Sequence, residues 1–62
     1  MSHDTTAPRA RILLIEDDQQ FAATLGLSLA TAGYDVMTAT SADNALALLA
    51  QYSFHLAIVD EK

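Results

Sequence analysis

The 62-residue sequence contains no cysteine. Disulfides, thiolate nucleophiles and thiolate metal sites are therefore excluded, and the chain lacks one of the usual means of stabilising a small scaffold. No apolar run approaches the roughly 20 residues that are needed to span a bilayer. The first ten residues also lack the apolar core of a secretory signal. We therefore expect a cytoplasmic protein without a membrane partner.

Basic residues are scarce as well. Three of them stand against eight acidic residues, giving a formal net charge of −5, which opposes binding of this segment to nucleic acid or anionic lipid. The apolar fraction of 52% is typical of a globular chain, but the length allows only one domain or part of one. We expect a disordered tail over residues 1–10 and a folded portion over residues 11–62.

The first half of the folded portion shows three secondary-structure patterns. Residues 12–15 form a short, unbroken apolar run, which is typical of a strand buried on both faces of a parallel sheet. Phe21, Leu25 and Leu29 recur at every fourth position, so they predict the buried face of a helix over residues 19–32, with Ala22 and Ala32 beside them. Gly33 marks its end. Residues 34–40 are rich in β-formers but less apolar, which indicates a strand near a sheet edge.

The second half repeats the alternation. Ser41 is a candidate N-cap for a helix that runs to about residue 52. The predicted buried face of this helix consists of Ala42, Ala45, Leu46, Leu49 and Ala50. Residues 54–59 are mostly apolar and predict a third strand, which is followed by Asp60. The order strand-helix-strand-helix-strand predicts an open α/β fold with parallel strands and helices on both faces.

Acidic residues follow two of the predicted strands. Glu16 and Asp17 come after the first strand, and Asp60 comes after the third. If these strands are neighbours, as in the flavodoxin-like order, the three carboxylates converge at one sheet edge. Like charges repel at close range, and a Mg²⁺ ion with oxygen ligands relieves that repulsion. A carboxylate beside bound magnesium is well placed to attack a phosphorus centre.

Structural roles for the same side chains remain open. Asp18 is better explained as a helix N-cap than as a metal ligand. Glu16 and Asp17 also suit a helix start that complements the helix dipole, and Asp60 suits a turn after a strand. Neither His3 nor His55 has a second ligand at a suitable spacing, so a transition-metal site is not expected.

The segments RILLIEDD, GYDVMTATSADNALALLA and LAIVD together resemble the first half of a response-regulator receiver domain. The resemblance covers residues 11–62 and implies a flavodoxin-like (CheY-like) doubly wound parallel sheet, truncated after its third strand. It implies a metal site in which Glu16, Asp17, Asp60 and the backbone carbonyl of Lys62 bind Mg²⁺, with Asp60 as the phosphoacceptor. The family also uses a Ser or Thr after the fourth strand and a Lys after the fifth, and the chain ends before both positions.

The expected function is therefore that of a phosphoryl-accepting module in a two-component phosphorelay. The resemblance implies a sensor histidine kinase or a phosphotransfer protein as the donor, and a signalling module rather than an enzyme. One alternative is an inactive pseudo-receiver that acts only in protein interaction, with self-association or strand exchange through an exposed half-domain edge. A nucleotide-binding α/β domain is disfavoured, because the first turn, IEDDQQF, contains neither GxGxxG nor a P-loop.

Overall fold

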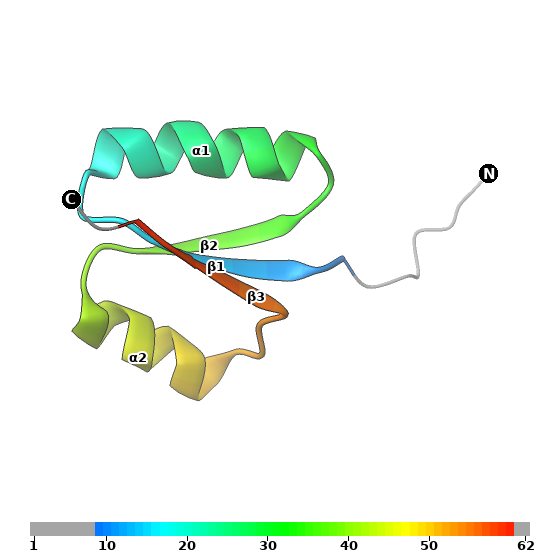
Figure 1. Ribbon diagram of the computed structural model, residues 1–62. Coiled ribbons are helices and arrows are strands. Elements are labelled where there is room, and N and C mark those ends of the chain that lie inside the picture. Colours follow the sequence, from blue (N-terminus) through cyan, green and yellow to red (C-terminus); the bar gives the residue numbers. More distant parts are fainter. Residues whose placement is uncertain (1–8, 61–62) are drawn as a thin grey trace.

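The computed structural model describes residues 9–60 and shows a three-stranded parallel sheet with one helix on each face (Figure 1). The elements are β1 (Arg11–Ile15), α1 (Gln19–Thr31), β2 (Asp35–Ala39), α2 (Ala42–Gln51) and β3 (Leu56–Val59). Their order in the sheet is β2-β1-β3. The predicted α/β alternation and the edge position of the second strand are confirmed. The tail prediction falls mainly on residues outside the described range.

Strand β1 is the centre of the sheet, and it is buried because it has neighbours on both sides and a helix over each face. Leu13 and Leu14 are completely buried, and Ile12 is nearly so. Leu13 pairs with Met37 of β2 on one side and with Ala57 of β3 on the other. Alternate side chains of a strand point to opposite faces, so the unbroken apolar run supplies core residues to both helices.

Local residue chemistry marks the starts of both helices and the end of α1. Asp18 accepts hydrogen bonds from the backbone N–H groups of Gln20 and Phe21 and so caps α1. Gly33 follows α1 with a φ of 104°, a left-handed conformation that glycine adopts without a steric penalty. Ser41 caps α2 by accepting a hydrogen bond from the N–H of Asn44. Within residues 9–60, neither helix is long and apolar enough to cross a membrane.

The predicted buried faces of the helices are partly wrong. In α2, Ala45 is buried and Leu48, which lay outside the predicted face, packs against the core. Leu46 and Leu49 belonged to the predicted face but are 64% and 51% exposed. The physical reason is that α2 packs on β1 and β2 and not on β3, so its side nearest β3 has no cover among the described elements.

The prediction for α1 is confirmed at Ala22 and wrong at Phe21 and Ala32. Ala22 is buried, while the neighbouring Phe21 is 45% exposed and Ala32, which caps the carboxyl end, is exposed. Leu25 and Leu29 in the middle of the face are half-buried. The fourfold spacing therefore identifies the correct side of α1 only in its central turns.

Arg11 connects four elements at the amino end of the sheet. Its backbone N–H donates to Nδ1 of His55 at 2.8 Å, and its carbonyl accepts the N–H of His55 at 2.8 Å. Its Nε donates to Oδ2 of Asp35 at 2.9 Å, at the start of β2. The guanidinium lies 5.4 Å from the ring centroid of Tyr52, directly after α2. Arg11 thus ties β1 to β2, β3 and the end of α2.

Truncating the central side chain of β1 tests this packing. We expect Leu13→Ala to lower the free energy of unfolding by about 2–5 kcal/mol, because it removes a buried side chain and leaves a cavity. Leu27→Ala is the matched control, since Leu27 is 70% exposed on α1 and its truncation should change stability by less than about 0.5 kcal/mol. Urea unfolding followed by circular dichroism measures both. Equal losses in the two variants would contradict the central position of Leu13 in the core.

Candidate functional site

The predicted acidic residues meet at the carboxyl edge of the sheet because β1 and β3 are neighbours. Ile15 and Val59 are paired in register, so the residues that follow them leave the sheet at the same level. The backbone N–H of Asp60 donates to the carbonyl of Ile15 at 3.1 Å, which holds Asp60 against the end of β1. Glu16 and Asp60, far apart in the sequence, therefore emerge side by side.

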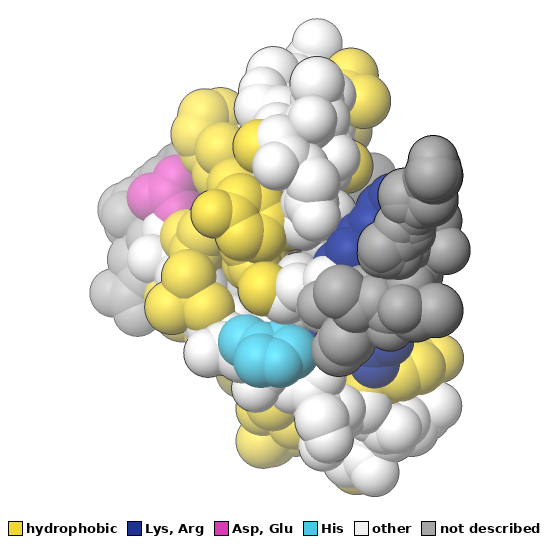
Figure 2. Space-filling view, turned by 90° about the vertical axis from the view of Figure 1, so that its right-hand side faces the viewer, with side chains coloured by type: hydrophobic (Ala, Val, Ile, Leu, Met, Phe, Trp, Pro, Cys, Tyr) yellow, Lys and Arg dark blue, Asp and Glu magenta, His cyan; other side chains and the backbone are white. Residues whose placement is uncertain are grey.

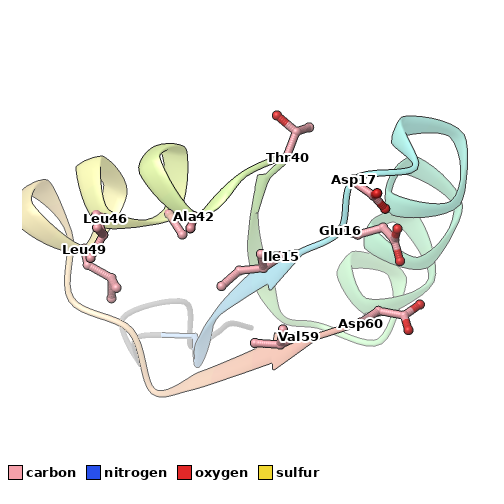
Figure 3. Close-up of a pocket in the computed structure, with 10 residues that line it drawn as sticks. Ile15, Glu16, Asp17, Thr40, Ala42, Leu46, Leu49, Val59 and Asp60 are labelled. Atoms are coloured by element: carbon pink, nitrogen blue, oxygen red, sulfur yellow. The ribbon is translucent and has the colours of Figure 1, made fainter. Parts of the chain in front are cut away.

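An open hollow of about 640 Å³ lies at this edge, between α2 and the ends of β1 and β3 (Figure 3). Its lining consists of Ile15, Glu16, Asp17, Thr40, Ala42, Ala45, Leu46, Leu49, Val59 and Asp60. The three acidic side chains lie at one end of the hollow, and Leu46 and Leu49 lie at the other (Figure 3). The hollow therefore has an acidic end and an apolar end.

The acidic side chains differ in their surroundings. Glu16 is only 1% exposed, and its Oε2 accepts the backbone N–H of Asp18 at 2.8 Å. The backbone N–H of Glu16 donates to the carbonyl of Ala39 at 2.9 Å, which joins the β1–α1 loop to the end of β2. Asp17 and Asp60 are exposed. Glu16 is therefore part of the wall of the site, while Asp17 and Asp60 are accessible to a ligand from solvent.

The donor set suits a hard cation that retains water ligands. Mg²⁺ is usually bound through one or two carboxylates, with waters and phosphate oxygens completing its shell. Over residues 9–60, no three Asp, Glu or His side chains lie close enough to hold a metal ion as a group. Asp17 and Asp60 are the exposed carboxylates on the lining of the hollow. The predicted ligand Lys62 lies outside the described residues.

Asp18 has the structural role that the sequence favoured. Its Oδ1 lies 3.1 Å from the backbone nitrogens of both Gln20 and Phe21. Asp18 is absent from the lining of the hollow. Its carboxylate is thus directed to the first turn of α1.

Sequence reasoning missed the positions of Thr40 and His55. Thr40 was assigned to a strand, but β2 ends at Ala39 and Thr40 lines the hollow. Its backbone N–H donates to Oδ1 of Asn44 at 3.2 Å. The available signal was its place at the carboxyl end of the predicted strand, at the edge where the acids also lie. For His55 no role was expected, and no local pattern indicates its contact with Arg11, 44 residues away.

Removing the cap of α1 should destabilise the loop that carries Glu16 and Asp17. We expect Asp18→Ala to lower the free energy of unfolding by about 1 kcal/mol, whereas Asp18→Ser, which keeps an acceptor oxygen, should lose much less. Asp43→Ala is the control, because Asp43 lies in the first turn of α2 but Ser41 caps that helix. Urea unfolding midpoints measure all three. A loss in Asp43→Ala as large as in Asp18→Ala would contradict the capping role.

Comparison with protein-family models and with curated proteins gave no significant match to this chain. Comparison with solved structures gave none either. A function for the chain therefore has to be inferred from the geometry and chemistry of the site.

Proposed function

We propose that this chain is the N-terminal portion of a receiver domain in a two-component phosphorelay, with Asp60 as the phosphoacceptor. The observation that carries the proposal is the meeting of Glu16, Asp17 and Asp60 on one hollow, at the carboxyl ends of two adjacent parallel strands. Open α/β sheets bind their ligands at this edge. The β2-β1-β3 order is compatible with the first three strands of a flavodoxin-like, CheY-like sheet.

In the proposed reaction, a carboxylate oxygen of Asp60 attacks the phosphorus of the donor. A new O–P bond forms as the bond between phosphorus and the leaving atom breaks, and the leaving group keeps the electron pair. With a phosphohistidine of a sensor kinase or phosphotransfer protein as donor, the broken bond is P–N and the product is an aspartyl phosphate. Asp60 is exposed, which makes it accessible to the donor.

The surrounding residues supply alignment and charge. The hydrogen bond from Asp60 N–H to Ile15 holds the nucleophile against the rigid centre of the sheet. Glu16, Asp17 and Asp60 would hold Mg²⁺, directly or through bound water, together with the carbonyl of Lys62, as the receiver resemblance implies. Bound magnesium offsets the negative charge of the phosphoryl oxygens. Glu16 keeps the β1–α1 loop in place through its bond with the N–H of Asp18. The phosphorelay role also implies a cytoplasmic location.

A second candidate function is protein interaction without phosphoryl transfer. It is favoured by the apolar end of the hollow, where Leu46 and Leu49 are more than half exposed. A pseudo-receiver would use this surface and would leave Asp60 unmodified. Phosphorylation of Asp60 is therefore the measurement that separates the two functions.

We expect incubation with acetyl phosphate and Mg²⁺ to add one phosphoryl group to the chain, detected by intact mass spectrometry. The adduct should be absent from Asp60→Asn and from a sample in which a chelator has removed the metal. Asp43→Asn is the matched control, because Asp43 is an exposed carboxylate outside the hollow. An adduct that persists in Asp60→Asn, or no adduct in the parent chain, would overturn the assignment of Asp60.

Magnesium should also stabilise the folded chain, because it binds the native arrangement of Asp17 and Asp60. At about ten times its Kd, the free energy of unfolding should rise by about 1.4 kcal/mol. Asp17→Asn and Asp60→Asn should each remove most of this gain, and Asp43→Asn should keep it. Samples are compared at constant ionic strength, because added salt alone screens the net charge of −5. An equal gain in all variants would indicate screening and would argue against a magnesium site.

A further inference from the structure

The contact between Arg11 and His55 at the amino end of the sheet depends on where the imidazole carries its proton. The backbone N–H of Arg11 donates to Nδ1 of His55 at 2.8 Å, and the backbone N–H of His55 donates to the carbonyl of Arg11 at 2.8 Å. An imidazole nitrogen accepts a hydrogen bond only while it carries no hydrogen. The contact therefore requires neutral His55, with the ring hydrogen on Nε2.

The imidazole takes the place of a backbone acceptor. Arg11 is the first residue of β1, and His55 directly precedes β3. In a parallel ladder, N–H groups pair with carbonyls of the neighbouring strand, but here the first N–H of β1 pairs with a side chain. A carbonyl keeps its lone pairs throughout the physiological pH range, whereas histidine titrates between about pH 5 and pH 8. One of the two bonds between Arg11 and His55 can thus be removed by a proton.

The charged groups of the neighbouring strands do not favour an imidazolium at this position. On β1 the side chain of Arg11 is positive, and the positive Arg9 precedes the strand. Asp35 begins β2, on the opposite flank of β1, and its Oδ2 pairs with Nε of Arg11 at 2.9 Å. Strand β3 itself contains no charged residue. The acid of this end of the sheet is therefore engaged by Arg11, not by His55.

The described helices add no acidic group at the amino end of the sheet. Helix α1 contains no charged residue, and the one acid of α2, Asp43, lies in its first turn. The carboxyl end of α2 favours a positive charge, but the guanidinium of Arg11 already lies there, 5.4 Å from the ring centroid of the uncharged Tyr52. Figure 2 shows histidine (cyan) and basic (dark blue) side chains on one face of the molecule. An imidazolium would therefore add a like charge to a basic surface.

We propose that His55 makes the attachment of β3 to β1 sensitive to pH. When the imidazole is neutral, Nδ1 accepts the N–H of Arg11 and holds the start of β3 beside β1. When a proton from solvent adds to Nδ1, this nitrogen becomes a donor that faces the donor N–H of Arg11, and the hydrogen bond is lost. The guanidinium also repels the new charge. The amino end of β3 is then held by fewer contacts.

The direction of the pH effect follows from linkage. The folded chain holds His55 beside a hydrogen-bond donor, and the unfolded chain does not, so the unfolded chain takes up more protons as the pH falls. The stability that the contact contributes is therefore present near about pH 8 and is lost as the pH falls toward about 5. His55 is absent from the lining of the hollow, so the inference goes beyond the proposed function and does not depend on it.

Urea unfolding at about pH 8 and about pH 5.5 tests the proposal. Between these pH values, we expect the folding equilibrium constant of the parent chain to fall about three- to tenfold more than that of His55→Asn, which is the range of a net hydrogen-bond contribution. Asparagine offers an amide oxygen to the N–H of Arg11 and does not titrate. Changes in the other ionisable groups are common to both chains and cancel. His3→Gln is the matched control and should keep the pH dependence of the parent, because residue 3 lies outside the described range.

Nitrogen NMR of the isotopically labelled parent chain locates the proton directly. At about pH 8, the imidazole signals of His55 should show Nδ1 without hydrogen and Nε2 with hydrogen. The amide signal of Arg11 should move as His55 titrates, and it should stay in place over the same pH range in His55→Asn. The measurement on the parent chain remains decisive even if circular dichroism shows that the variant does not fold.

Three results would each overturn the proposal. These are an equal pH dependence in the parent chain and His55→Asn, a hydrogen on Nδ1 of His55 at about pH 8, or an Arg11 amide signal that does not follow the titration of His55. The acetyl phosphate assay is run at one fixed pH and reads Asp60 alone. Failure of the pH-sensitive contact and failure of the phosphoacceptor are thus distinguished.

Discussion

The structure depends on one constraint, which is that β1 must be covered on all sides. Leu13 and Leu14 have no exposed surface, and this is possible only with strands on both flanks and a helix over each face. Hydrophobic burial is the main favourable term in folding, and here it is concentrated on a single strand. Helix α1 connects β1 to β2 and helix α2 connects β2 to β3, and these two crossovers place β2 and β3 on either side of β1.

The candidate site is a consequence of the same arrangement. Parallel strands end at the same edge, so acids that follow β1 and β3 are brought together without any direct interaction between them. Two backbone hydrogen bonds fix this edge, from the N–H of Glu16 to the carbonyl of Ala39 and from the N–H of Asp60 to the carbonyl of Ile15. The packing of the sheet therefore determines where these carboxylates lie.

Much of this could be predicted from the sequence, because the relevant signals are local. The cap at Asp18, the left-handed residue Gly33 and the cap at Ser41 each mark a helix boundary within a few residues of chain. The apolar run of β1 and the acids after β1 and β3 likewise follow from short patterns.

Other features required the tertiary structure. Periodicity shows which side of α2 is apolar but not which part of that side is covered, so Leu48 was missed and Leu46 and Leu49 were wrongly assigned to the core. The Arg11–His55 contact joins residues 44 positions apart and has no local signature. Sequence also places the carboxylates at one edge without giving the distances between their oxygens, which decide whether they form a metal-binding group.

The one-sided pairing of β3 has a consequence for dynamics. A strand held by a single neighbour opens more readily than the strand at the centre, and amide hydrogen exchange reports such local opening. Asp60 directly follows β3 and is tied to β1 by one backbone hydrogen bond. Within residues 9–60, β3 is the strand on which no helix packs, so local opening of β3 would separate Asp60 from Glu16 and Asp17.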